Sequence, residues 1–260
     1  MKENYLKKIL HTFIDAKSFL RKESNYRKGY CVLMYHALGS QAYQDPNGNH
    51  SINPKLFQRH MEYIKTQNNF EIDQLINIKK NLHKNKIAVT FDDGYKDNLL
   101  KGLPILQKLN IPFTIFVSTQ FVKDKNTNFL SKNDIRFLSN IKGVTIGSHG
   151  ENHVPFTDLT KGQLNRELLE SKKFLEDLVG KEIELLAYPF GKTNEDIKNR
   201  SEQAGYKVCF GTIFGRNIPN ADLKEIKRIN ILKNDNERRF VNKVKGDWDC
   251  YSIWQRARNL

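Results

Sequence analysis

Short apolar runs alternate with segments whose apolar residues recur at helical spacing along most of this chain. The runs predict buried strands and the periodic segments predict amphipathic helices. The clearest helix spans 160–178, because Thr160 and Gln163 form a capping box at its start and Gly180 follows its end. We predict strands at 31–35, 87–91, 112–119, 144–147, 184–188, 207–212 and 226–231, and helices from Pro54, at 74–82, 95–109, 133–140, 160–178, 195–204 and 235–244.

This alternation predicts a parallel sheet covered by helices. About seven strands in one domain of 260 residues favour an α/β barrel, which can be complete or incomplete. We expect a basic helical extension at 1–29, the main α/β domain at 30–246 and an aromatic, basic tail at 247–260. Pro104 is expected to break or kink the helix predicted at 95–109.

The chain is strongly basic, with 43 Lys and Arg against 29 Asp and Glu and a net charge of +14. Such a surplus indicates either an anionic partner or simply a solvated basic surface. We give the two interpretations equal weight, because the basic residues are spread along the chain rather than clustered. No nucleic-acid motif accompanies the charge, so no nucleic-acid partner is expected. The three distant cysteines, Cys31, Cys209 and Cys250, argue against a disulfide framework and fit a reducing compartment.

No apolar stretch is long enough to cross a membrane, and the N-terminus carries no continuous apolar core of a signal peptide. These observations predict a cytoplasmic protein. The basic N-terminal segment has apolar residues at roughly helical spacing. It is therefore expected either to pack on the domain or to lie on an anionic membrane surface, which would make the protein peripheral to the membrane.

Candidate chemistry begins where the apolar run 87–91 meets Asp92, Asp93 and Gly94. Two carboxylates at a strand end can divide two tasks, because consecutive strand residues point to opposite faces. An alternative interpretation is a helix cap. A second polar cluster, His149 to His153, also follows a short strand. One carboxylate and two imidazoles form a mixed ligand set that leaves positions open on a divalent ion, as catalytic zinc sites do, with cobalt or nickel as alternatives.

Three motifs resemble the first three motifs of the polysaccharide deacetylase family, the NodB-homology enzymes of carbohydrate esterase family 4. They are Thr90-Phe91-Asp92-Asp93-Gly94-Tyr95, His149-Gly150-Glu151-Asn152-His153 and Ala187-Tyr188-Pro189-Phe190-Gly191. The resemblance implies a distorted, incomplete (β/α)7-type barrel. It implies that Asp92 is the base, that Asp93, His149 and His153 hold the metal, and that the Phe190 N–H contributes to an oxyanion hole. Tyr95, Tyr188, Pro189 and Gly191 are expected to contact substrate.

Three departures from the family pattern stand out. Gly150 replaces a Ser or Thr that braces the loop, Tyr188 replaces an Arg that pairs with the base, and no histidine follows His153 to serve as the acid. A subgroup that deacetylates poly-β-1,6-N-acetylglucosamine has a Tyr-Pro-aromatic-Gly third motif and an N-terminal Tyr-His. Here Tyr35-His36 is similar, which makes His36 the candidate general acid. Asp97 is expected either to cap the following helix, which we favour, or to orient groups of the site, and Asp45 is a weak candidate partner for His36.

The resemblance implies a metal-dependent hydrolase that removes acetyl groups from an N-acetylated sugar in a surface glycan or in its nucleotide- or lipid-linked precursor. A second interpretation is hydrolysis of another non-peptide C–N bond, since some relatives act on cyclic amides. A third is a non-catalytic glycan-binding or interaction protein of the same fold, which the departures at Gly150 and Tyr188 motivate.

Overall fold

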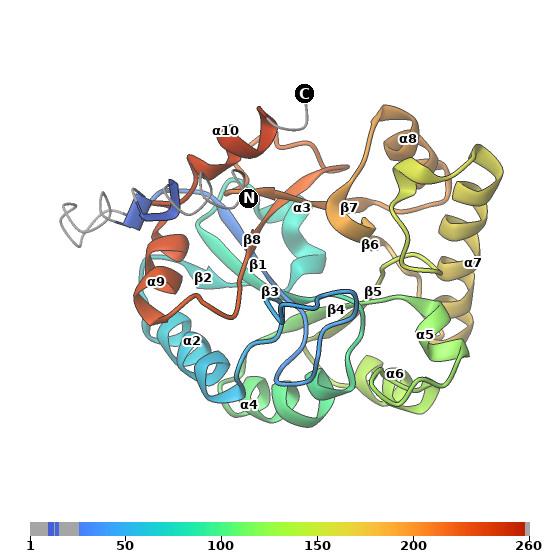
Figure 1. The fold of residues 1–260 in the computed structure, drawn as a ribbon, viewed down its shortest axis with the longest axis horizontal. Helices are drawn as coiled ribbons and strands as arrows, with labels where there is room; N and C mark the ends of the chain where they lie inside the picture. Colours follow the sequence, from blue (N-terminus) through green and yellow to red (C-terminus); the bar gives the residue numbers. More distant parts are fainter. Residues whose placement is uncertain (1–9, 13, 16–25, 258–260) are drawn as a thin grey trace.

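Parallel strands close into a barrel in the computed structural model of the protein, which describes residues 10–12, 14–15 and 26–257 (Figure 1). Going round the ring, the order is β1, β3, β4, β5, β6, β7 and β8; β1 pairs with both β3 and β8, and the short β2 pairs outside the ring with β3. The predicted (β/α)7-type barrel is confirmed. The strands are β1 (Tyr30–Tyr35), β2 (Glu71–Ile72), β3 (Lys86–Phe91), β4 (Phe113–Val117), β5 (Val144–Ser148), β6 (Leu185–Ala187), β7 (Val208–Phe214) and β8 (Ile226–Asn230).

The helices that cover the barrel follow the strands in sequence. The α-helices are α2 (Pro54–Thr66), α3 (Ile78–Asn81), α4 (Leu103–Lys108), α5 (Thr119–Lys123), α6 (Lys132–Ser139), α7 (Lys161–Val179), α8 (Glu195–Gln203), α9 (Glu237–Lys245) and α10 (Tyr251–Arg256). The capping box at Thr160 forms as predicted, and Gly180 ends α7 with a φ of +67°. The helix predicted at 95–109 is interrupted: a single wide turn covers Asn98–Gly102, and Pro104 lies in the first turn of α4.

Alternating strand residues build two layers of core. Val32, Ala88 and Phe116 belong to a smaller cluster, made largely by strand residues, that fills the barrel. Their neighbours Leu33 and Val89 belong to a larger cluster that also contains helix residues and therefore lies between strands and helices. Both faces of each strand are thus buried, which explains why these strands read as continuous apolar runs.

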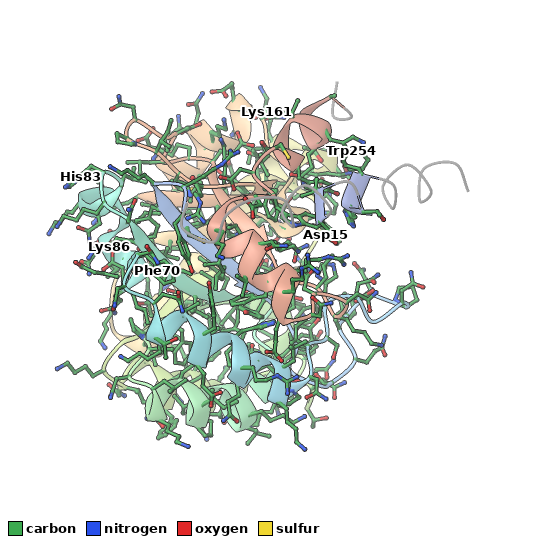
Figure 2. The ribbon with its side chains drawn as sticks, turned by 90° about the vertical axis from the view of Figure 1, so that its left-hand side faces the viewer. Asp15, Phe70, His83, Lys86, Lys161 and Trp254 are labelled. Atoms are coloured by element: carbon green, nitrogen blue, oxygen red, sulfur yellow. The ribbon has the colours of Figure 1, made fainter. Side chains whose placement is uncertain are left out.

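Both ends of the described chain pack on this core. Ile14, Trp248 and Tyr251 are buried in the larger cluster, and Arg239 of α9 pairs with Asp15 at 2.6 Å. In Figure 2, Asp15 and Trp254 lie toward the right, whereas His83, in the turn before β3, and Lys86, the first residue of β3, lie toward the left. The rest of the predicted N-terminal helix lies outside the described residues. Among those residues, no helix has the length and apolar character needed to cross a membrane.

Gly147 gives a test of how tightly the barrel is packed. A Cβ at this position on β5 would lie 2.6 Å from the Phe116 ring and 3.2 Å from the carbonyl oxygen of Leu185. We therefore expect Gly147→Ala to lower the free energy of unfolding by about 1–3 kcal/mol, measured by urea denaturation. Gly162 in α7 has nothing within 4 Å of an added Cβ, so Gly162→Ala should leave stability unchanged or raise it. Equal effects at both positions would contradict this packing.

Candidate active site

The polar residues singled out in the sequence meet at the carboxyl ends of the strands. Parallel pairing sets Tyr35 opposite Phe91, so His36 and Asp92 follow at the same level, and the Asp92 N–H donates to the Tyr35 carbonyl at 2.9 Å. His149 follows β5 and Phe190 follows β6. A cavity of about 420 Å³ opens here, and its wall includes His36, Asp92, Asp93, His149, His153 and Phe190.

Asp93, His149 and His153 form a cluster with the character of a metal site. Asp93 Oδ1 lies 3.3 Å from His149 Nε2 and 3.1 Å from His153 Nε2, and all three side chains are buried. The two histidines hold the pKa of Asp93 well below its usual range, although burial alone would raise it. A carboxylate facing two imidazoles in a buried site is the donor set that a divalent ion takes.

The surroundings of these residues fit a bound cation. His149 Nδ1 lies 2.8 Å from the Ala187 carbonyl oxygen, which can only accept, so Nδ1 carries the proton and Nε2 is left with a lone pair. Asp93 Oδ1 is buried without a hydrogen-bond partner among the described residues. A divalent ion would satisfy both atoms. The pair His149 and His153 lies on a loop rather than on one helical turn, the second of the two geometries that the sequence allowed.

Local backbone strain orients several of these groups. Asp93, His153 and Phe190 have φ values of +71°, +52° and +60°, a region that costs residues other than glycine about 1–3 kcal/mol. At Asp93 this conformation turns the chain sharply after Asp92. The two neighbouring carboxylates therefore face different partners.

Asp92 faces an arginine that the sequence analysis did not identify. Arg228 of β8 donates from Nη1 and Nη2 to the two carboxylate oxygens at 2.6 and 2.8 Å, and from Nε to the Gly211 carbonyl at 2.9 Å. Both side chains are fully buried. Burial alone would raise the pKa of Asp92, but the guanidinium holds it below its ordinary value. The pairing arginine missing from the third motif is thus supplied by another strand.

A second residue missed in the sequence replaces the hydroxyl absent at Gly150. Glu167 of α7 accepts hydrogen bonds from the backbone N–H groups of Glu151 and Asn152 at 2.7 and 3.0 Å, and from the Asn152 side chain at 2.6 Å. Gly150 has a φ of +73°, and a Cβ there would lie 3.2 Å from Glu167 Oε2. The Glu167 carboxylate braces the loop that carries His149 and His153, and its closeness explains why a glycine occupies position 150.

His36 lies at the cavity wall beside His50, with 4.4 Å between the ring centroids. Its backbone carbonyl accepts from the Asn98 side chain at 2.8 Å. Desolvation and then His50 lower the pKa of His36 to about 4, against the opposing charges of Asp93 and Asp92. The Asp45 carboxylate accepts from the backbone N–H of His50 at 2.7 Å and thus holds the adjacent loop.

Of the four residues expected to contact substrate, only Tyr188 lies in the cavity wall. Its side chain is buried, and its hydroxyl donates to the Lys224 carbonyl at 2.9 Å. Tyr95 is buried behind the wall and accepts from the Tyr43 N–H at 2.6 Å. Pro189 is buried, and Gly191 is fixed by close contact, since a Cβ would lie 2.0 Å from Thr212 Oγ1.

The prediction that Asp97 caps the following helix is wrong. No side-chain cap bond forms there, and the Asp97 carboxylate instead accepts from the backbone N–H and hydroxyl of Ser40 at 2.9 and 2.7 Å. It therefore holds the loop between β1 and α2. Cys31 and Cys209 are buried, and Cys250 is exposed; all three are free, as expected of a chain without a disulfide framework.

Comparison with known proteins places this architecture in a family. The sequence model described as polysaccharide deacetylase matches residues 79–209, half of the chain. YxkH of Bacillus subtilis, a protein named for that family, is 26% identical over 206 residues, covering 77% of this chain and 70% of YxkH. The poly-β-1,6-N-acetyl-D-glucosamine N-deacetylase of Staphylococcus epidermidis is 24% identical over 218 residues, covering 78% of this chain and 74% of that enzyme.

A solved structure supports the fold. The Streptococcus pyogenes deacetylase PplD superposes with a TM-score of 0.73 at 22% identity, over 84% of this chain and 99% of that one. The chain belongs to the polysaccharide deacetylase family, whose members hydrolyse N-acetyl amide bonds in sugars.

The buried pair of Arg228 and Asp92 predicts a large effect on stability. Arg228→Ala leaves a buried carboxylate without its counter-charge, so the free energy of unfolding should fall by about 3–5 kcal/mol in urea denaturation. The control Arg200→Ala breaks an i,i+4 pair with the half-exposed Asp196 and should cost less than about 1 kcal/mol. Similar losses in both variants would mean that the folded protein does not need the Arg228 charge to stabilise the buried Asp92 carboxylate.

Proposed function

We propose that this protein removes acetyl groups from N-acetylglucosamine units of a glycan, with Asp92 as general base, His36 as general acid and the Phe190 N–H as oxyanion donor. The observation that carries the proposal is the shared cavity: a carboxylate paired with an arginine lies beside three candidate metal ligands and a histidine. The name of the Staphylococcus epidermidis relative supports the choice of sugar. The non-catalytic interpretation loses its motive, because Arg228 and Glu167 make up for the two departures.

Asp93, His149 and His153 would hold the ion, which we propose to be zinc. Their mixed set of one carboxylate and two imidazoles favours zinc and also suits cobalt or nickel. When bound, a divalent ion supplies a Lewis acid that acidifies water and polarises a carbonyl.

Asp92 takes the proton of the attacking water. The Arg228 pair fixes the direction of the carboxylate and also makes it a weak base, because the guanidinium depresses its pKa. Such a base suits only an acidified water, which ties the role of Asp92 to the neighbouring ligand cluster. The acetyl oxygen gains negative charge as the water attacks, and we assign the Phe190 N–H to that oxygen.

His36 protonates the leaving amine. Desolvation keeps its imidazole neutral in the free protein at neutral pH, so the proton has to arrive during the reaction. Asp92, at the adjacent strand end, acquires one when it deprotonates the water. Transfer from Asp92 to His36 and then to nitrogen conserves the proton and returns both residues to their starting states.

Location and source of the sugar extend this proposal. The net charge of +14 supports the proposal that the protein contacts an anionic membrane surface. We also propose that it acts in the cytoplasm. Of the described N-terminal residues, Ile14 is buried in the larger core cluster and Leu10 packs against that cluster, so these apolar side chains face the domain. A nucleotide- or lipid-linked sugar and a polymer are alternative substrates.

Metal dependence is the first expectation. The purified protein should bind one divalent ion and release acetate from N-acetylglucosamine oligomers, and removal of the ion should abolish release. His149→Ala and Asp93→Ala should lose tight binding, measured by metal analysis after dialysis, because each removes one of three ligands. His83→Ala, remote from the cluster, is the control. Stoichiometric metal in both ligand variants would disprove the assignment.

His36 is tested by two leaving groups. His36→Ala should bind metal normally and lose about 10²–10⁴-fold in amide hydrolysis. On an aryl acetate the loss should be much smaller, because a phenolate leaves with little protonation. Steady-state kinetics on both substrates with one variant gives the comparison. An equal loss on amide and ester would assign His36 to substrate binding or folding.

A further inference from the structure

The imidazole of His36 lacks the hydrogen bond that usually orients a histidine. Its Nδ1 is buried without a hydrogen-bond partner among the described residues. The bond made by one ring nitrogen ordinarily sets which nitrogen carries the proton and how the ring lies. Asn98 holds the backbone carbonyl of His36 rather than its ring, and the Asp45 carboxylate bonds to the backbone of His50. Packing must therefore set the direction in which the His36 ring points.

His50 provides that packing. The two imidazole rings lie with their centroids 4.4 Å apart and their planes inclined by 56°. Both residues belong to the wall of the catalytic cavity. Removal of the His50 ring would open space beside His36, into which the His36 side chain could turn by changing its rotamer.

Backbone pairing brings the two histidines together. Ala37 and Ser51 form an isolated parallel β-bridge. The Ala37 N–H donates to the His50 carbonyl at 3.2 Å, and the Ala37 carbonyl accepts from the Ile52 N–H at 2.9 Å. Residues that directly precede a parallel pair are in register with each other, so His36 and His50 lie side by side on the same face. The contact between the rings thus follows from the way the loop between β1 and α2 closes.

The segment that carries His50 is anchored on both sides. The backbone N–H of His50 donates to the Asp45 carboxylate at 2.7 Å. The preceding residue, Asn49, accepts from the backbone N–H of Lys233, which follows β8, at 2.7 Å. In Figure 1 the loop between β1 and α2, drawn in blue, passes in front of β3 and β4. His50 is therefore held beside His36 before a ligand binds, as is required of a group that orients another.

The direction of the His36 ring matters for the proposed reaction. The ring has to take a proton from Asp92 and deliver it to the leaving amine, and each transfer needs a heavy-atom distance of about 2.6–3.2 Å. A displacement of about 1 Å can cost roughly a hundredfold in rate. The contact also opposes a charge on His36, because His50, after desolvation, is the group that lowers the pKa of His36. A proton that reaches His36 is thus readily passed on.

We propose that His50 is a positioning residue for the general acid. Its ring holds the imidazole of His36 in the direction in which His36 takes the proton from Asp92 and gives it to the leaving amine. His50 itself transfers no proton. This inference rests on the proposed deacetylase function and adds a second histidine, from the loop between β1 and α2, to the groups that the reaction needs.

The test begins with acetate release from N-acetylglucosamine oligomers by metal-loaded protein. His50→Ala should lower kcat by about ten- to a hundredfold, while KM and the bound metal stay close to their wild-type values. His50→Phe keeps an aromatic ring at the position and should retain most of the wild-type kcat. His50→Gln, which has no ring, should behave as His50→Ala does and takes its place if the alanine variant does not fold. His83→Ala removes an exposed histidine and should leave kcat unchanged.

Two comparisons separate positioning of the acid from a general effect on the loop. On an aryl acetate, whose leaving group needs little protonation, His50→Ala should lose much less than on the amide. In the His36→Ala background, His50→Ala should cause no further loss of amide hydrolysis, because the group that it positions is absent. A similar loss on amide and ester, a further loss in the His36→Ala background, or a His50→Phe variant as slow as His50→Ala would overturn the proposal.

The wild-type protein distinguishes failure of this inference from failure of the function on which it rests. Metal-loaded wild-type protein that releases no acetate from any N-acetylglucosamine oligomer would overturn the deacetylase function and the inference with it. Acetate release by the wild type at a rate that His50→Ala leaves unchanged would overturn the positioning role alone. Thermal denaturation establishes that each variant is folded before its rates are compared.

Discussion

The buried ion pair between Arg228 and Asp92 is the interaction on which the rest of the site depends. It joins β8 to β3, and the Arg228 Nε–H adds a hydrogen bond to Gly211 of β7. Each charge is fully buried, so each would be costly without the other. The guanidinium also lies over the Phe116 ring of the barrel interior at 5.7 Å. The pair therefore links the packed core directly to the cavity at the strand ends.

This constraint separates the tasks of two adjacent carboxylates. With Asp92 fixed by Arg228, the positive φ at Asp93 turns the next carboxylate toward His149 and His153. One aspartate is neutralised by a permanent cation, and the other is surrounded by groups that suit an exchangeable one. The strained backbone at Asp93, His153 and Phe190 lies in the turns that follow the buried strands β3, β5 and β6, whose packing holds it in place.

Much of this arrangement could be predicted from the sequence because it is local. Apolar runs marked the strands of the ring, and the residues that directly follow three of them marked the ligands and the candidate base and acid. Arg228 escaped prediction because it is 136 residues from Asp92, in a strand where a neighbouring lysine makes it look like a surface cation. Glu167 lies on α7 among exposed acidic residues, and only the packing of that helix against the histidine loop reveals its role. The missing arginine in the third motif was the one available signal that a partner for Asp92 had to come from elsewhere.

The central claim, that Asp92 acts on water beside a metal held by Asp93, His149 and His153, is tested most directly by Asp92→Asn. The asparagine keeps the shape of the side chain and removes its basicity. Thermal denaturation of the purified variant first establishes that it is folded. The account then predicts that it retains one divalent ion per chain while acetate release from N-acetylglucosamine oligomers falls by about 10²–10⁴-fold. Near-normal acetate release from the metal-loaded variant would contradict it.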